Sequence, residues 1–246
     1  MADQEAVLVE VDGPKLVITL NRPEVLNAQN QAMRQGIVDA LDRLEASEDL
    51  RVAILVGAGE RAFSAGADLK ELEELRSGGT FRPGALPPSR DPTQIHFERL
   101  KSVTKPVIAA IHGYAVGGGL EMALHCDLRV ATESARLGQP EPRTVGGMAG
   151  VAVHHLPRLV PMGEALRILL TGAPISGRRA YEIGLVQEVG ADREAMWAAA
   201  QALADEIVLC APEAVYRTKI LVRAARNMTS EQTEAMARAM ALTRPR

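Results

Sequence analysis

The chain has 246 residues, a formal net charge of −3 and 47% hydrophobic residues, enough for one large domain or one domain with an appended helical subdomain. Only 3% of the residues are aromatic, which argues against nucleic-acid binding by base stacking, and the weak negative charge offers no general attraction to phosphate backbones or anionic lipid. Cys126 and Cys210 are the only cysteines, too few for a disulfide framework or a cysteine-based zinc site.

No part of the sequence predicts insertion into a membrane. No apolar run approaches the ~20 residues that span a bilayer. The acidic residues Asp3, Glu5 and Glu10 do not resemble the positively charged start of a signal peptide. We therefore expect a cytoplasmic protein with no membrane partner.

Strand and helix patterns alternate along the first part of the chain. Residues 7–11 and 16–20, separated by a turn that contains Gly and Pro, predict a hairpin, and residues 52–56 predict a short buried strand. Between them, Asn27 is expected to be the N-cap of a helix. The apolar face of that helix comprises Met33, Ile37, Ala40, Leu41 and Leu44. Another helix is expected to begin near Asp68.

Residues 77–92 differ in composition from the segments around them. They hold four Pro and three Gly and few apolar residues, which is typical of a long irregular loop. Because this segment follows a motif of small residues at positions 64–68, it is a candidate lid over a site.

The second half of the chain begins with strands and continues mainly as helices. Residues 106–111 and 128–131 predict buried strands, and a helix is expected to begin within residues 117–119. From Gly147 onward the pattern is almost entirely helical, with one interruption at residues 185–189.

Three helices of this half carry recognisable end signals. A helix over residues 161–170 is expected to close at Gly172. Asp192 can cap a helix that runs to about Cys210. Thr229 and Gln232 fit a capping box for the last helix.

Gly117, Gly118 and Glu121 form the first motif that suggests chemistry. A glycine run at the start of a helix leaves backbone N–H groups open, and the helix dipole favours negative charge there. Close helix–strand packing or a phosphate cradle are the alternatives, although Glu121 would repel phosphate. Gly118 and Glu121 share a helix face, which allows the carboxylate to handle a proton beside a backbone donor, unless it serves only the dipole.

The second motif is Ser64-Ala65-Gly66-Ala67-Asp68. Its small residues let a ligand approach the backbone, and Asp68 can cap the helix that follows. A plain strand-to-helix turn is the alternative interpretation. Ser64 is disfavoured as a nucleophile because no histidine partner stands at a recognisable position.

The third motif is Gly138-Gln139-Pro140-Glu141, which places a carboxylate on a loop restricted by proline. In an apolar pocket the pKa of Glu141 would rise, so that the group could donate a proton near neutral pH. An ordinary surface glutamate is the alternative. Backbone donors combined with two carboxylates suit the polarisation of a carbonyl and the movement of protons beside it.

The histidines do not predict a metal site. His154 and His155 are adjacent, so they do not share a helix face and are expected on a helix surface. His96, His112 and His125 have no companions at ligand spacing.

Taken together, these motifs resemble the enoyl-CoA hydratase/isomerase (crotonase) family. The similarity covers roughly residues 7–216 and is specific as an ordered set. Its parts are Asn21-Arg22-Pro23, Leu26-Asn27-Ala28, Phe63-Ser64-Ala65-Gly66-Ala67-Asp68-Leu69, Lys105-Pro106-Val107-Ile108-Ala109-Ala110, Gly113-Tyr114-Ala115-Val116-Gly117-Gly118-Gly119, Gly138-Gln139-Pro140-Glu141, Leu170-Thr171-Gly172, and Ala180 with Gly184-Leu185-Val186.

The resemblance implies an α/β fold with a spiral of repeated strand–strand–helix turns over residues 1–190. It further implies a helical C-terminal domain over residues 191–246 that is short for the family. Relatives normally assemble as trimers or dimers of trimers, so a homotrimer or a dimer of trimers is expected. The implied substrate is an acyl-CoA thioester.

Individual roles follow from position in the family motifs. The backbone N–H groups of Ala67 and Gly118 would form an oxyanion hole. Glu121 would activate or position water, and Glu141 would exchange a proton with the α-carbon. The residues that would lie along coenzyme A are Ala67, Asp68, Leu69 and Lys70, with Ala65 near the adenine.

Two departures from the family pattern bear on substrate and assembly. After Glu141 the family usually continues with Gly and then Pro-Gly, whereas this chain has a different sequence over residues 142–150, beside the implied acyl pocket. Relatives also usually carry a further stretch beyond the position of Arg246, which packs on a neighbour and can touch coenzyme A.

The sequence therefore predicts an acyl-CoA hydratase or dehydratase, a hydro-lyase. Its thioester enolate chemistry calls for no metal or redox cofactor, since coenzyme A is part of the substrate. An enoyl-CoA isomerase on the same scaffold is the nearest alternative. A non-catalytic binding subunit has no need of both glutamates, and a peptidase with a related spiral fold would require a Ser–His pair.

Overall fold

The computed structural model describes residues 5–77, 91–144 and 150–242. The candidate lid at residues 77–92 lies outside this part of the chain except at its ends, and so does most of the unusual segment 142–150. Within the described residues the strands form two sheets, one with the order β1-β2-β3-β5-β7-β10 and one with the order β4-β6-β8-β9.

The larger sheet begins with the predicted hairpin. Its strands are β1 (Val7–Asp12), β2 (Lys15–Leu20), β3 (Val52–Gly57), β5 (Val107–Ile111), β7 (Leu128–Thr132) and β10 (Glu188–Gly190). β1 and β2 are antiparallel, with Val7 opposite Leu20, and every later neighbour is parallel. All six residues of β3 are buried, because helices cover both faces of the sheet.

The smaller sheet takes one strand from each of the last four strand pairs of the spiral. Its strands are β4 (Ala62–Ser64), β6 (Tyr114–Val116), β8 (Arg136–Gly138) and β9 (Ile175–Ser176). β4, β6 and β8 are parallel, and β9 runs antiparallel to β8. Each consecutive strand pair from β3 to β10 thus places one strand in each sheet, whereas β1 and β2 both lie in the larger one. This is the strand–strand–helix spiral expected from the resemblance.

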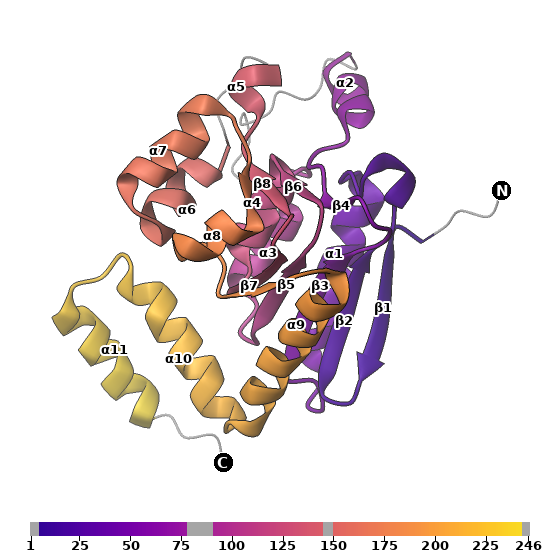
Figure 1. Ribbon diagram of the computed structural model, residues 1–246. Helices are drawn as coiled ribbons and strands as arrows, with labels where there is room; N and C mark the ends of the chain where they lie inside the picture. The colour runs from indigo at the N-terminus through magenta and orange to yellow at the C-terminus, as the bar shows by residue number, and fades with distance from the viewer. Residues whose placement is uncertain (1–4, 78–90, 145–149, 243–246) are drawn as a thin grey trace.

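Helices connect and cover the strands (Figure 1). They are the 3-10 helix η1 (Pro23–Val25) and the α-helices α1 (Gln31–Ala46), α2 (Leu69–Ser77), α3 (Ile95–Ser102), α4 (Gly118–His125), α5 (Glu141–Thr144), α6 (Ala152–Leu159), α7 (Met162–Thr171), α8 (Gly177–Glu182), α9 (Arg193–Leu209), α10 (Pro212–Ala225) and α11 (Ser230–Leu242).

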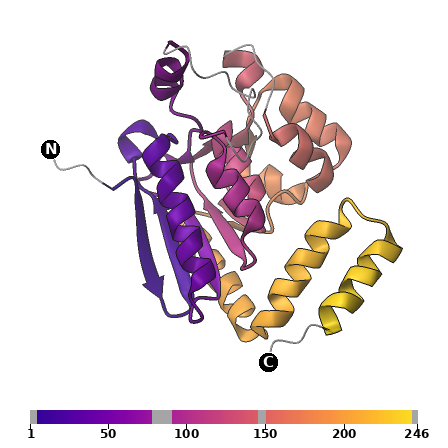
Figure 2. The same ribbon diagram turned by 180° about the vertical axis from the view of Figure 1, so that it is seen from behind.

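The two faces of the large sheet bury different helices. On one face, α9 places Met196, Ala200 and Ala204 against a cluster that includes Ile54 and Ile108. On the other face lie α1, α3 and α4, which form the larger core cluster. Figure 1 shows α9 across the first face, and Figure 2 shows α1 across the second.

The last two helices add little to this core, which α10 contacts through polar bonds of Lys219 and Arg223 to Asp127. α10 and α11 pack against each other and extend away from the sheets (Figures 1 and 2), and neither contains a buried residue. The division into a core of residues 1–190 and a helical domain of residues 191–246 stays a prediction. No helix among the described residues has the length and apolar character needed to cross a membrane, and the cytoplasmic location stays a prediction.

The expected helix ends are confirmed in three places. Gly172 adopts the left-handed conformation, with φ of 61°, at the end of α7. Asp192 accepts a hydrogen bond from the Ala195 N–H at the start of α9. Thr229 and Gln232 form the reciprocal capping box, at 2.9 and 3.2 Å.

The N-cap of the first long helix was assigned to the wrong asparagine. Asn30, not Asn27, accepts the hydrogen bond from the Met33 N–H. Asn27 is fully buried with φ of 55°, and its amide donates to the carbonyls of Ala58 and Ala62. Asparagine suits both a helix cap and a left-handed turn, so only the long-range contacts decide between the two positions.

Candidate active site

The turn between β4 and α2 approaches the start of α4 very closely. Gly66 has φ of +90°, and a Cβ on it would lie 2.8 Å from the Gly118 nitrogen. A side chain there would therefore be strained and would also block that nitrogen. Ser64 at the end of β4 donates its hydroxyl proton to the Asn27 carbonyl at 2.8 Å, a structural role with no nucleophilic character.

The Ala67 N–H is left open by the way its neighbours are paired. Ala67 forms a parallel bridge with Gln29, in which the Gln29 N–H donates to the Gly66 carbonyl and the Asp68 N–H donates to the Gln29 carbonyl. In parallel pairing the flanking residues make the bonds, so the N–H of the central residue points away. No hydrogen bond within the described residues takes up the Ala67 N–H.

The Gly118 N–H is open because it begins a helix. Gly117 is the N-cap of α4, with φ of 54°, and the Glu121 N–H makes the first intrahelical bond to the Gly117 carbonyl at 3.0 Å. The Gly118 N–H thus belongs to the unpaired donors of a helix start. A Cβ on Gly118 would lie 3.5 Å from the Ala67 nitrogen, so the two open N–H groups are neighbours.

Glu121 lies in the first turn of α4 and is 7% exposed. Its Oε1 accepts a hydrogen bond of 3.3 Å from the Ala152 N–H at the start of α6. Burial raises the pKa of Glu121 to about 7, and the negative charge of Glu141 acts in the same direction, against the backbone N–H groups of Ala152 and Val151. The carboxyl of Glu121 therefore gains or loses its proton near neutral pH.

Glu141 begins the short helix α5, rather than lying on a loop as the sequence suggested. A Cβ on Gly117 would lie 3.0 Å from its Oε1, so this carboxyl adjoins the N-cap of α4. Its Oε2 is buried and has no hydrogen-bond partner within the described residues. Burial raises the pKa of Glu141. The structure thus brings both predicted carboxyls to the start of one helix.

The residues after Ala67 form an accessible rim. Leu69 is 68% exposed, Lys70 is exposed and Ala65 is half-buried. Asp68 caps α2 as expected, accepting from the Lys70 and Glu71 N–H groups. Burial by itself would raise the pKa of Asp68. The hydrogen bond from Arg22 at 2.9 Å and the backbone N–H groups outweigh burial and lower this pKa.

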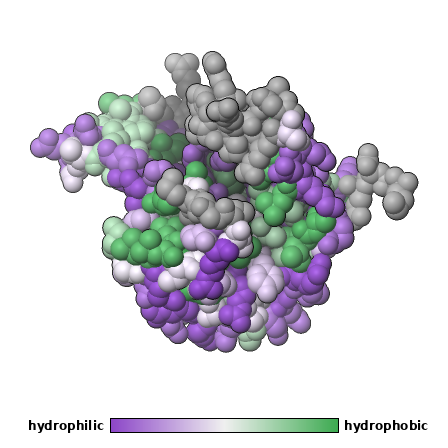
Figure 3. Space-filling view, turned by 90° about the horizontal axis from the view of Figure 1, so that it is seen from above, coloured by the Kyte–Doolittle hydropathy of each residue, from purple (hydrophilic) through white to green (hydrophobic). Residues whose placement is uncertain are grey.

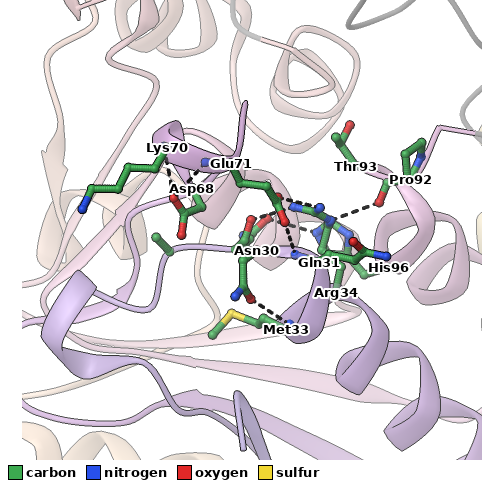
Figure 4. A network of polar contacts seen from close by, with 12 residues as sticks. Asn30, Gln31, Met33, Arg34, Asp68, Lys70, Glu71, Pro92, Thr93 and His96 are labelled. Carbon is green, nitrogen blue, oxygen red and sulfur yellow. Dashed lines mark hydrogen bonds and ion pairs between the residues drawn. The ribbon is translucent and has the colours of Figure 1, made fainter. Parts of the chain in front are cut away.

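A buried arginine, which the sequence interpretation missed, ties this rim to the core (Figure 4). Arg34 is 3% exposed and pairs with Glu71 at 2.7 Å. It also donates to the backbone carbonyls of Gln29 at 2.7 Å and Pro92 at 3.0 Å. In Figure 4 the Lys70 side chain extends away from this network. A charged residue between Met33 and Ile37 on the apolar face of α1 was the available signal.

The histidines are more buried than the sequence suggested. His154 is exposed as expected, but His155 is half-buried and its ring lies 4.5 Å from that of His125. His125 also stacks on Phe97 at 4.9 Å. No group of three His, Cys, Asp or Glu residues in the described ranges could hold a metal ion.

The face at the α2 and α5 end of the molecule mixes two kinds of surface. Apolar side chains gather in patches between hydrophilic ones (Figure 3).

Comparison with known proteins agrees with this fold. Residues 14–245 match the family described as enoyl-CoA hydratase/isomerase. The short-chain-enoyl-CoA hydratase of Clostridium acetobutylicum is 38% identical over 218 residues, which cover 87% of this chain and 79% of that protein. The (E)-benzylidenesuccinyl-CoA hydratase of Thauera aromatica is 38% identical over 217 residues, covering 87% and 80%. The chain belongs to the enoyl-CoA hydratase/isomerase family.

Solved structures support the same assignment. A crystal structure of enoyl-CoA hydratase from Mycobacterium tuberculosis H37Rv superposes with a TM-score of 0.85 at 36% identity, covering 96% of this chain and 89% of that one. An enoyl-CoA hydratase from Mycobacterium marinum gives a TM-score of 0.86 at 35% identity, covering 97% and 90%. The expected crotonase fold is confirmed.

Proposed function

We propose that this protein is an enoyl-CoA hydratase, which adds water reversibly to the double bond of a 2-enoyl-CoA thioester. The observation that carries the proposal is the convergence of two neighbouring open N–H groups, of Ala67 and Gly118, with two carboxyls of raised pKa, Glu121 and Glu141. Relatives that carry the name hydratase support the same reaction.

In the proposed mechanism the thioester oxygen accepts hydrogen bonds from Ala67 and Gly118. Negative charge builds on this oxygen as water attacks C3, and the two donors stabilise it. Ionised Glu121 removes a proton from the attacking water, and protonated Glu141 delivers a proton to C2. The double bond has then gained one water, and proton exchange between the carboxyls and solvent restores the starting state.

The rim that follows Ala67 is proposed to hold the coenzyme A part of the substrate. Leu69 and Lys70 are exposed beside the donor turn, and Lys70 offers a positive charge to phosphate. The carboxylate of Asp68 is paired with Arg22, so Asp68 contributes through its backbone. Ala65, half-buried at the start of the turn, is proposed to lie near the adenine.

The C-terminal helices support a proposed homotrimer or dimer of trimers. A cleft of about 1200 Å³ is lined by α10 and the core, and Lys219 and Arg223 of α10 pair with Asp127 of the core. The helices and their junction expose large apolar side chains, with Leu209 88%, Val222 61% and Leu242 87% exposed. Burial of such side chains against a second copy of the chain would be favourable.

Isomerisation of a 3-enoyl-CoA on the same scaffold is the alternative. It moves one proton between two carbons, for which one base suffices, whereas water addition uses two groups. The adjacent position of Glu121 and Glu141 therefore favours hydration.

Incubation with a panel of 2-enoyl-CoA and 3-enoyl-CoA thioesters, followed by mass spectrometry and chromatography, tests the proposal. A hydratase adds the mass of water to one or more 2-enoyl substrates. Conversion of 3-enoyl to 2-enoyl thioesters with no water gained would support the isomerase instead. The variant Glu121→Gln/Glu141→Gln serves as the inactive control.

A further inference from the structure

Gln29 is a buried polar residue that bonds to the backbone on both sides of the two open donors. It lies just before α1 and is 3% exposed. Its backbone N–H donates at 2.8 Å to the Gly66 carbonyl, which belongs to the same peptide group as the Ala67 N–H. Its side-chain Nε2 donates at 3.0 Å to the carbonyl of Gly118. One residue therefore spans the turn and the helix start that carry the two donors.

The direction of every hydrogen bond around the Gln29 amide is determined by its partners. A carbonyl can only accept, so Nε2 must face Gly118 and Oε1 must face the other way. Ser64 Oγ gives its proton to Asn27 and so accepts from Nε2 at 3.3 Å. On the far side, Oε1 lies 3.1 Å from Nε2 of His96, which must therefore donate.

His96 on α3 is suited to remain a neutral donor. It is fully buried, and its Nδ1 has no hydrogen-bond partner within the described residues. Protonation of Nδ1 would bury an unpaired N–H and a positive charge near Arg34. Burial above all, together with the charges of Arg34 and His125, lowers the pKa of His96 well below its usual value. The ring of Phe97 lies 3.9 Å from the His96 ring, which restricts its movement.

We propose that Gln29, oriented by His96, is a positioning residue that sets the spacing of the Ala67 and Gly118 N–H groups. The inference rests on the proposed function of those groups as an oxyanion hole. A donor held at the right place before the reaction lowers the barrier most. The backbone bond from Gln29 to the Gly66 carbonyl also polarises the Ala67 N–H of the same peptide group, because linked hydrogen bonds reinforce one another. The side-chain bond to the Gly118 carbonyl acts on the next peptide along and so contributes through position alone.

Gln29→Met is the principal test, because methionine keeps the length of the side chain and removes both of its polar ends. The backbone bond to Gly66 stays in place. We expect kcat for the best enoyl-CoA substrate to fall ~10-fold, with KM changed by less than about 2-fold, since the loss is felt mainly in the transition state.

A spectroscopic readout separates positioning from general destabilisation. The carbonyl stretching frequency of bound butyryl-CoA, an unreactive saturated thioester, reports how strongly the donors polarise the carbonyl. In Gln29→Met it should lie closer to the value in free solution. Gln187→Met is the matched control. The side-chain amide of Gln187 also bonds to backbone groups, those of Gly184 and Arg129, but it lies away from the two donor turns. This control should leave kcat and the frequency unchanged.

Gln29→Glu adds a rescue test. When protonated, the introduced carboxyl would donate to the Gly118 carbonyl and accept from His96, whereas an ionised carboxylate would set two acceptors against each other. The ratio of variant to wild-type kcat should therefore rise as pH falls, while the ratio for Gln29→Met should stay flat. If either methionine or glutamate prevents folding, His96→Phe removes the orienting partner without touching Gln29 and should lower kcat several-fold.

The outcomes distinguish this inference from the proposed function. Folded Gln29→Met with wild-type kcat and an unshifted carbonyl frequency, beside a slow Gly118→Pro, would overturn the role of Gln29 and leave the oxyanion hole intact. A folded Gly118→Pro that reacts at the normal rate would overturn the proposed function itself.

Discussion

The two halves of the proposed site are built in opposite ways. The donors at Ala67 and Gly118 are backbone groups, and the turns that carry them are held by Gln29, Arg34 and the pairing at Gly66. The carboxyls of Glu121 and Glu141 are side chains with sparse support within the described residues, one bond of 3.3 Å and one unpartnered oxygen. Groups that must hold a fixed position are rigidly bonded, and groups that must gain and lose protons are left free to do so.

The largest expected effects come from the carboxyl half. Glu141→Gln and Glu121→Gln should each lower turnover by ~10²–10⁴-fold, because an amide cannot transfer the proton. Steady-state rates on the best enoyl-CoA, with circular dichroism to check folding, measure this. Near-native rates in both variants would contradict the hydratase mechanism.

The donor half should respond nearly as strongly when one N–H is removed. Gly118→Pro is expected to slow the reaction ~10²–10³-fold, or about 2.7–4 kcal/mol in the barrier. Because proline can disturb the start of α4, circular dichroism must show an intact fold. An oxygen-ester analogue should still bind to wild type but react far more slowly, since its α-proton is less acidic.

A pair of alanine substitutions isolates the close approach of the two donors. Gly66→Ala would place a Cβ 2.8 Å from the Gly118 nitrogen at φ of +90°, so we expect a loss of at least ~10-fold in kcat/KM and lower stability. Gly163→Ala is the control, since a Cβ there meets nothing within 4 Å. It should leave activity unchanged. Equal rates in both variants would mean that the approach at Gly66 has no role in binding or reaction.

The carboxyl half should also cost stability in a pH-dependent way. The folded pKa of Glu121 is raised to about 7 from 4.5, so between these values the native state binds more protons than the unfolded state, and stability falls as pH rises. Glutamine avoids this cost. Glu121→Gln should therefore be more stable than wild type at pH 8, on the order of 1–3 kcal/mol, and should lose that advantage near pH 4.

Thermal unfolding at both pH values, read by circular dichroism, measures this difference. A constant difference in Tm across the range would show that Glu121 is not the group that titrates.

The smallest effect is expected far from both halves. Asp192→Ala removes the N-cap of α9 and should cost about 1 kcal/mol of unfolding free energy with no change in turnover. Chemical denaturation gives the free energy, and the hydratase assay gives the turnover. A large loss of activity at unchanged stability would link α9 to the site, which its contacts do not suggest.

The sequence by itself determined the features that local chemistry controls. The capping residues of α9 and α11 and the left-handed glycine after α7 were predicted because their hydrogen bonds close within a few residues. The buried strands β3 and β5 were predicted because continuous apolar runs leave few alternatives. The ordered family motifs predicted the spiral, while the roles that they imply for the two donors and both glutamates stay predictions.

Only the tertiary structure decided what depends on residues far apart in the chain. The strands of the small sheet have two or three residues each, too short for a periodic pattern, and form only when successive turns of the spiral stack. Asn27 and Asn30 have similar local preferences, and contacts across 31 and 35 residues assign Asn27 to the turn. In the sequence Gln29 has no feature that distinguishes it from other polar residues. Its role depends on a hydrogen bond to Gly118, which lies 89 residues further along the chain. A buried hydrogen bond of this kind has no local sequence signal because its partner is supplied by chain topology.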